Sequence, residues 1–169
     1  SFALGQTATI TGQQEGLFSW TDVNYLTGGL QNNNTSGIIE MGGASSQIAF
    51  KSPDGINNSN ITSLCANNIN YNVYSISYLG LGQDSARSTM NLAPNYNYCY
   101  PVGYSATVSG VLINGSFGFE SCITNYEAVT ESPAFSSLSQ TSSQPGFSNT
   151  SFIGLSSIYY AFAFWNINS

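Results

Sequence analysis

Histidine is absent from this 169-residue chain, and only Lys51 and Arg87 carry a positive charge at neutral pH. Eight Asp and Glu residues bring the net charge to −6. A nucleic-acid-binding protein needs a basic surface against the phosphates, so the composition excludes that class. Because cations are so scarce, any anionic ligand has to be held by backbone N–H groups, hydroxyls, a metal ion or a second domain.

Cysteine is also scarce, with Cys65, Cys99 and Cys122 widely spaced along the chain. Without histidine and without a C-x-x-C pair, the sequence argues against a structural zinc site. One disulfide and one leftover thiol fit an oxidising compartment. No apolar run approaches the about 20 residues of a membrane-spanning helix, so we expect no membrane segment in this chain.

Charged residues make up only 6% of the chain, against about 25% in an average soluble domain. Asparagine and serine supply the polar surface instead, which favours an extracytoplasmic location (secreted, periplasmic or in the secretory pathway). Without an initiator Met or a signal-peptide pattern, we expect a mature or excised fragment. N-glycosylation sequons, as a glycoprotein would carry, lie at Asn33, Asn34, Asn57, Asn60, Asn114 and Asn149. They mean little alone, because an Asn/Ser/Thr-rich chain produces them by chance.

Hydrophobic periodicity and turn residues predict strands and helices in a mixed order. Strands are expected at residues 37–41, 45–51, 71–81 and 106–113, and residues 7–11 are expected to end another. Helices are expected at 15–30, 83–90 and 123–129, and loops at 52–70, 91–105 and 132–151; residues 153–166 fit a strand or a helix. The order predicts one α/β domain over residues 1–169, with a mixed sheet and flanking helices.

The stretch GQQEGLFSW at residues 12–20 places the carboxylate of Glu15 where a predicted strand passes into a helix. Ligands gather at that end of an open α/β sheet, where a helix N-terminus also presents free N–H groups. Glu15 could therefore act at a ligand site. The alternative is that it only stabilises the first helical turn.

The second stretch contains Gly42, Gly43, Ala44 and Ser45 between two predicted strands. Two glycines remove the Cβ atoms that would keep a phosphate away from the backbone, so successive N–H groups can form an anion-binding nest. Ser45 and Gln47 point to one face of the strand and could hold a water molecule. An ordinary tight hairpin with a Gly-Gly turn explains the same pattern equally well.

Glu40 ends the strand before this turn and suits a hard divalent cation, directly or through water; the alternative is a solvated acid at a strand end. The aromatic run at residues 159–165 is predicted to belong to the core, because aromatic stripes usually do. In the other interpretation, a tyrosine at its edge stacks on a planar base.

Both stretches resemble signatures of the apyrase family, the nucleoside triphosphate diphosphohydrolases. Residues 10–20 fit the third signature, [Ile/Leu]-[Ser/Thr]-Gly-x-x-Glu-Gly-x-[Tyr/Phe]-x-Trp, and Asn24 and Tyr25 follow in place. Residues 41–48 fit the fourth signature, but Glu40 stands where the family has Asp. Residues 71–82, 99–104 and 152–160 resemble later family elements, so the resemblance covers almost the whole chain.

The resemblance implies the second (C-terminal) lobe of a two-lobe, actin-like (RNase H-like) fold with a sheet of about five strands. It implies hydrolysis of nucleoside tri- or diphosphates with Mg²⁺ or Ca²⁺. It implies that Glu15 is the general base and that Ser45 and Gln47 position the attacking water. It implies that Glu40 binds the metal through water and that the phosphates are bound by the loop residues Gly42, Gly43, Ala44 and Ser45. The site for the nucleobase would be lined by Tyr160, Ser157 and Gln83. It also implies a Cys99–Cys122 disulfide, with Cys65 unpaired because Gly80 replaces the family's other cysteine.

The family's first two signatures, which belong to its other lobe, do not occur in the chain. We therefore expect the N-terminal lobe to be a partner absent from this chain, and the chain alone to be nearly inactive. The alternative is a non-catalytic nucleotide- or glycan-binding relative that kept the fold, and a weaker one is a structural surface domain. Glu40 in place of Asp adds a methylene, which an octahedral Mg²⁺ shell tolerates poorly.

Overall fold

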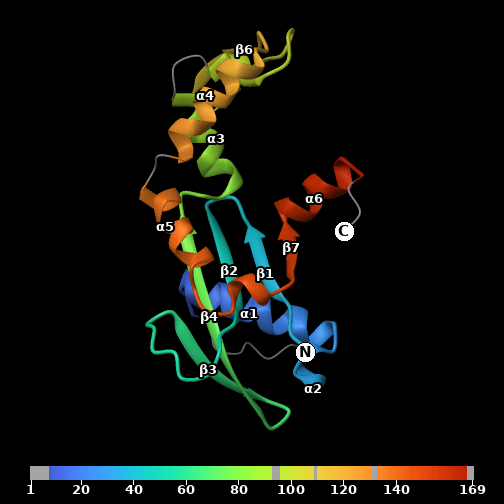
Figure 1. The fold of residues 1–169 in the computed structure, drawn as a ribbon. Helices are drawn as coiled ribbons and strands as arrows, with labels where there is room; N and C mark the ends of the chain where they lie inside the picture. The colour runs from blue at the N-terminus through green and yellow to red at the C-terminus, as the bar shows by residue number, and fades with distance from the viewer. Residues whose placement is uncertain (1–7, 93–95, 109, 131–132, 167–169) are drawn as a thin grey trace.

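The computed structural model describes residues 8–92, 96–108, 110–130 and 133–166 (Figure 1). The first half comprises α1 (Gly12–Leu26), α2 (Gly29–Asn32), β1 (Gly37–Met41), β2 (Ser45–Lys51), β3 (Ile61–Ala66) and β4 (Ile69–Leu79). The second half comprises α3 (Gln83–Leu92), η1 (Tyr96–Cys99), β5 (Ser105–Val108), β6 (Val111–Asn114), α4 (Phe119–Thr130), α5 (Pro133–Ser142), η2 (Phe147–Asn149), β7 (Phe152–Ser156) and α6 (Ser157–Phe164).

The central sheet has the strand order β3-β4-β2-β1-β7. β7 runs parallel to β1, and the other neighbouring strands pair antiparallel. The predicted mixed sheet of about five strands with flanking helices is therefore confirmed. In its register Glu40 lies opposite Gln47, and Met41 lies opposite both Ser46 and Ser156. The two predicted motifs thus meet at one end of the sheet.

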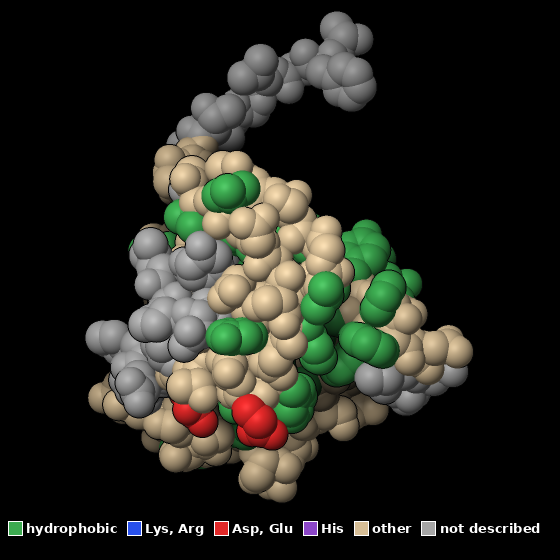
Figure 2. Space-filling view, turned by 90° about the horizontal axis from the view of Figure 1, so that it is seen from above, with side chains coloured by type: hydrophobic (Ala, Val, Ile, Leu, Met, Phe, Trp, Pro, Cys, Tyr) green, Lys and Arg blue, Asp and Glu red, His purple; other side chains and the backbone are tan. Residues whose placement is uncertain are grey.

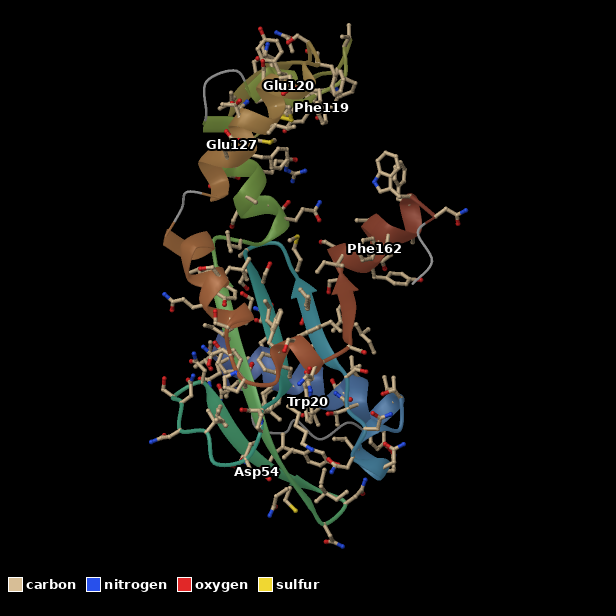
Figure 3. All side chains as sticks on the ribbon, in the orientation of Figure 1. Trp20, Asp54, Phe119, Glu120, Glu127 and Phe162 are labelled. Carbon is tan, nitrogen blue, oxygen red and sulfur yellow. A yellow bond between two sulfur atoms is a disulfide. The ribbon has the colours of Figure 1, made fainter. Side chains whose placement is uncertain are left out.

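Each face of the sheet carries a hydrophobic cluster. On one face Trp20 of α1 packs with side chains of β1, β2 and β4, and its ring lies between the helix and the sheet (Figure 3). On the other face Phe50, Tyr74 and Tyr78 pack with side chains of α3, α5 and η2. β2 is buried on both sides, with Ala49 and Phe50 both fully inaccessible to solvent. The sheet is therefore covered on both faces, and the candidate site lies at one of its ends.

The helix α1 begins at Gly12, earlier than the predicted start at residue 15. Thr11 is its N-cap and forms a capping box with Gln14, which satisfies two backbone donors at the helix start. The strand end predicted at residues 7–11 is wrong for residues 8–11, which have no regular structure, and residue 7 lies outside the described residues. The difference arises because Thr11 caps the helix. An N-cap residue has an extended backbone but needs no pairing with a neighbouring strand.

All three segments predicted as loops are partly regular. Residues 91–105 contain the end of α3 and the short helix η1. Within residues 52–70 the chain forms β3 and the start of β4, which are joined at Asn67 and Asn68. Both asparagines have positive φ, of 50° and 60°, as a tight two-residue hairpin turn requires. Within residues 132–151 the chain forms α5, which begins at Pro133, a favoured first helical residue. Polar composition hid both elements, since each exposes one side to solvent.

An arm extends beyond the end of the sheet and contains α3, η1, α4 and the β5–β6 hairpin (Figure 1). The strand predicted at 106–113 is instead two strands, because Gly110 adopts a positive φ of 81° between them. The predicted helix at 123–129 lies inside α4. A disulfide joins Cys99 to Cys122 in the arm, as the resemblance implied, and Cys65 is a free, exposed thiol on β3.

The prediction that residues 159–165 form core is wrong. Residues 159–164 belong to the short helix α6, which has no buried residue, and Trp165 is its C-cap. Tyr160, Phe164 and Trp165 are 71%, 79% and 71% exposed. Phe162 projects from the helix away from the sheet (Figure 3). Hydrophobic side chains gather on this side of the molecule in the view from above (Figure 2). None of the described helices is both long and apolar enough to cross a membrane.

Candidate active site

A connected polar cluster joins the two predicted motifs. The side-chain amide nitrogen of Gln47 lies 2.9 Å from Glu15 Oε2, 2.8 Å from Ser45 Oγ and 3.1 Å from Ser77 Oγ. Gln47 is only 1% exposed, whereas Glu15 reaches solvent. The amide therefore fixes a carboxylate and a hydroxyl on the same side of the sheet end.

Glycines in α1 bring the Glu15 carboxylate this close to the sheet. A Cβ atom on Gly16 would lie 2.6 Å from Ser75 Oγ, and one on Gly12 would overlap the side chain of Ser77. Ser75 Oγ also donates to the carbonyl of Gln13 over 2.8 Å. Because Gly12 and Gly16 present no side chain of their own to β4, the start of α1 lies close to the sheet and Glu15 in its first turn meets Gln47 of β2.

The loop between β1 and β2 has two chemically different sides. The carbonyls of Gly42 and Gly43 accept hydrogen bonds from the first backbone N–H groups of α3, over 2.8 to 3.1 Å. Their side of the loop is thereby tied to the arm. By contrast, the N–H groups of Gly43 and Ala44 have no hydrogen-bond partner within the described parts of the chain, and both residues are exposed. These two groups can donate to an anion, as a nest requires. The N–H of Gly42, which was predicted to bind phosphate as well, instead donates to the carbonyl of Ser45 over 3.0 Å.

Gly82 supports the loop from behind. A Cβ atom at this buried position would lie 2.5 Å from backbone atoms of Ala44, so only glycine lets the two backbones approach. The hydroxyl of Ser46 donates to the carbonyl of Leu81 over 2.6 Å, and the N–H of Gly80 donates to the carbonyl of Ala44 over 2.9 Å. The segment after β4 thus determines the shape of the glycine loop.

Glu40 lies on the same face as Gln47, its partner across the strand pair. Its carboxylate does not extend freely into solvent. It accepts a hydrogen bond from Ser19 Oγ at 2.7 Å and another from Ser156 Oγ at 3.2 Å. The described residues contain no group of three or more His, Cys, Asp or Glu side chains that could hold a metal ion by themselves.

The three predicted base-binding residues come together in a hollow of about 430 Å³. Gln83 from α3 and Ser157 and Tyr160 from α6 line it, together with Met41 and Ala161. Ser157 Oγ donates to Gln83 Oε1 over 2.7 Å, which links the two helices. Tyr160 is 71% exposed, so its ring face is accessible to a ligand.

Residue patterns alone did not identify four contributors to this end of the sheet. Ser19, Ser77 and Ser156 became visible only when α1, β4 and β7 were placed around the two motifs. Asp84 also faces the glycine loop, since a Cβ atom on Gly43 would lie 3.0 Å from its Oδ2. Single serines and an acid in a first helical turn carry no spacing signal, so their roles depend on tertiary placement.

A base-like carboxylate, an oriented amide and hydroxyl, and two free backbone donors are together suited to holding a water molecule beside an anionic group. Comparison with known protein sequences assigns the chain to a family. A sequence model of the GDA1/CD39 (nucleoside phosphatase) family matches residues 2–163, and the chain belongs to that family.

Several curated proteins match part of the chain. Probable apyrase 4 of Arabidopsis thaliana is 35% identical over 111 residues, which is 57% of this chain and 22% of that protein. The nucleoside-triphosphatase ntp-1 of Caenorhabditis elegans is 30% identical over 130 residues, 68% of this chain and 24% of that protein. Mouse ectonucleoside triphosphate diphosphohydrolase 6 is 40% identical over 89 residues, 46% of this chain and 19% of that protein.

Among solved structures, a nucleoside triphosphate hydrolase from Neospora caninum is similar. The alignment covers 91% of this chain and 37% of the Neospora caninum chain. The TM-score is 0.45 and the sequence identity is 18%. In all of these comparisons the chain spans well under half the length of its relatives.

Proposed function

We propose that this chain is the second lobe of a two-lobe, actin-like enzyme that hydrolyses nucleoside tri- or diphosphates to lower phosphates and inorganic phosphate. The observation that carries the proposal is the Glu15–Gln47–Ser45 hydrogen-bonded set. Ser45 and Gln47 lie on β2, directly after the unpartnered N–H groups of Gly43 and Ala44, and Glu15 reaches them from α1. It combines a proton acceptor, a means of orienting water and donors for phosphate oxygens.

In the proposed reaction, Glu15 accepts a proton from a water molecule whose oxygen attacks the terminal phosphorus. Ser45 holds that water, and Gln47 fixes Ser45 and Glu15 in the same frame. The N–H groups of Gly43 and Ala44 donate to the terminal phosphate oxygens. Gly42 and Ser45 close the loop around these donors through the hydrogen bond from the N–H of Gly42 to the carbonyl of Ser45. Phosphoryl transfer needs mainly positioning and charge compensation, and these residues supply the positioning.

The acidic residues of the site make a divalent cation a good fit. Glu15, Glu40 and Asp84 belong to the site region, while the cation of Arg87 pairs with Asp84 on the exposed side of α3. Mg²⁺ typically keeps several waters and uses one or two carboxylates plus substrate phosphates. Glu40 would hold Mg²⁺ or Ca²⁺ through water, and the ion would neutralise the charge of the phosphates.

The base of the nucleotide would occupy the hollow formed by Met41, Gln83, Ser157 and Tyr160. The exposed ring of Tyr160 offers a stacking surface, which every base can use. The paired side chains of Gln83 and Ser157 offer hydrogen bonds at its edge.

The remaining groups would come from an N-terminal lobe that carries the family's first two signatures and supplies cations. The disulfide, the low charge and the likeness to an ectonucleoside triphosphate diphosphohydrolase support an extracytoplasmic location. The rival candidate is a non-catalytic nucleotide- or glycan-binding relative, which Glu40 in place of the family's Asp favours.

Phosphate release distinguishes these possibilities. We expect a protein that contains this chain and the N-terminal lobe to release phosphate from ATP or ADP only with Mg²⁺ or Ca²⁺. The purified 169-residue chain should show negligible release, because loss of one stabilising donor typically lowers the rate about 10²- to 10³-fold and several donors are missing. Nucleotide binding without release by the two-lobe protein would support the non-catalytic relative. Robust metal-dependent release by the chain alone would contradict the proposed division of the site.

A further inference from the structure

The carboxylate of Glu40 is held from two sides. Ser19 of α1 donates to Oε2 over 2.7 Å, and Ser156 at the end of β7 donates to Oε1 over 3.2 Å. The two serines come from elements that contact β1 on different sides, and Ser156 lies 116 residues from Glu40 in sequence. Each carboxylate oxygen therefore has one hydroxyl donor and retains lone pairs for other partners.

The backbone of Ser156 is adapted to this contact. Its φ is 55° and its ψ is −124°, a conformation that non-glycine residues rarely adopt and that costs about 1–3 kcal/mol. Ser156 is also the N-cap of α6, but its side chain makes no capping hydrogen bond. The hydroxyl is directed to Glu40 instead of to the helix, so local helix stability does not explain the strained conformation.

Ser19 ties Glu40 to the proposed general base. It lies four residues after Glu15, which places both side chains on one face of α1. On the sheet, Glu40 is the cross-strand neighbour of Gln47, which holds Glu15. The two carboxylates are therefore positioned by the same pair of elements.

From these contacts we infer that Ser19 and Ser156 are positioning residues, which fix the longer glutamate side chain of Glu40 so that its free lone pairs face the water shell of the cation. The inference rests on the proposed function. A glutamate has one more rotatable bond than an aspartate, so an unrestrained Glu40 would present its oxygens in many orientations. Two hydroxyl donors remove that freedom, and a shorter side chain at the same strand end would not reach them.

A double-mutant cycle in the two-lobe protein tests the inference, with Mn²⁺ binding in the presence of a non-hydrolysable nucleotide measured by electron paramagnetic resonance. Ser19→Ala should weaken Mn²⁺ binding about tenfold, as expected for loss of one hydrogen bond to a charged group. In a Glu40→Asp background, Ser19→Ala should change Mn²⁺ binding less than about twofold, because coupling disappears when the contact is absent. Thr21→Ala, which removes a hydroxyl bonded only to the backbone of the same helix, is the control.

Ser156→Gly separates positioning from stability. It removes the hydroxyl and relieves the backbone strain, so Mn²⁺ binding should weaken while the thermal midpoint stays unchanged or rises. Equal effects of Ser19→Ala in both backgrounds, or unchanged Mn²⁺ binding in Ser19→Ala and Ser156→Gly, would overturn the inference. Absence of phosphate release from the unmodified protein would overturn the proposed function instead, and the Mn²⁺ measurements would still decide the role of the two serines.

Discussion

Gln47 donates its side-chain amide to Glu15 across 2.9 Å and so connects the buried strand β2 to the first turn of α1. The donor is almost fully buried and the acceptor reaches solvent. A buried amide that holds an accessible carboxylate fixes the position of the carboxylate without removing it from water. This relationship supports the general-base role proposed for Glu15 and leads to the first prediction.

In the two-lobe protein, Glu15→Gln should lower the rate of phosphate release about 10²- to 10⁴-fold and leave nucleotide binding nearly unchanged. The glutamine is close in size and its carbonyl can still accept the hydrogen bond from Gln47, but it cannot take a proton from water. Phosphate release and nucleotide binding by calorimetry are the measurements. Asp22→Asn, an exposed acid on the same helix, is the control. A rate within a few-fold of the unmodified protein would show that Glu15 only stabilises the start of the helix.

Two glycine substitutions should have different effects on the glycine loop. Gly82→Ala should destabilise the protein, because its methyl group would overlap the backbone of Ala44 and Ser45. Gly43→Ala should fold normally, since its methyl group meets only the flexible side chain of Asp84. It should nevertheless weaken nucleotide binding, because the methyl group lies where a phosphate approaches. Thermal unfolding and nucleotide titration of both variants check this; equal stability of the two would contradict the role given to Gly82.

Stability should decline in strong alkali through Tyr78. Burial raises the pKa of Tyr78 above its ordinary value of 10.0; the hydrogen bond with Thr141 lowers it, and nearby Tyr74 raises it further. Because the folded-state pKa is above the unfolded one, the stabilisation is complete below pH 10 and is lost as the pH rises through the folded-state value. The free energy of unfolding should fall by up to about 1.4 kcal/mol per pH unit above pH 10 from this group.

Urea unfolding at intervals between pH 9 and pH 12 measures that slope. Tyr78→Phe should give a smaller slope than the unmodified chain, even though it loses the hydrogen bond to Thr141. Tyr159→Phe, at an exposed position on α6, is the control and should leave the slope unchanged. Identical slopes in all three proteins would show that Tyr78 does not titrate differently in the folded state.

Removal of the disulfide should loosen the arm more than the sheet. Cys99 and Cys122 are 23 residues apart, and a closed loop of this size stabilises by about 3 kcal/mol in the chain-entropy description. Cys99→Ser should therefore speed amide hydrogen exchange in η1, β5, β6 and α4, with little change in β2. Cys65→Ser removes an exposed free thiol and should change the free energy of unfolding by less than about 0.5 kcal/mol. Uniform loss of protection in sheet and arm would mean that the two unfold as one unit.

The sequence was sufficient for β1, β2 and β4 and for the convergence of the two motifs. Alternating side chains in β2 and β4, and the glycines at 42 and 43, are local signals that the fold preserves. The β3–β4 hairpin was missed because its Asn-Asn turn lies in a polar stretch, although two adjacent asparagines can adopt the positive φ that the turn needs. The aromatic residues of α6 were misplaced because hydrophobicity alone does not show which packing surface a helix has available.

The contacts around Glu40 could not have been predicted from the chain alone. Ser19 and Ser156 are common residues at positions without a characteristic spacing, and they meet only because β7 pairs with β1 and α1 crosses the same sheet. The two free N–H groups of the glycine loop are also a tertiary result. The carbonyls of Gly42 and Gly43 accept hydrogen bonds from the start of α3, which follows in the sequence only after β2, β3 and β4.

The parallel pairing of β7 with β1 has a consequence for folding. It joins segments separated by more than half of the chain, and closing such a long loop carries an entropy cost that only late contacts repay. During synthesis, β1, β2 and the glycine loop leave the ribosome long before Ser156 does. Glu40 therefore gains its second hydroxyl donor only after the arm has been synthesised and the last strand has been added, so this end of the sheet is completed late.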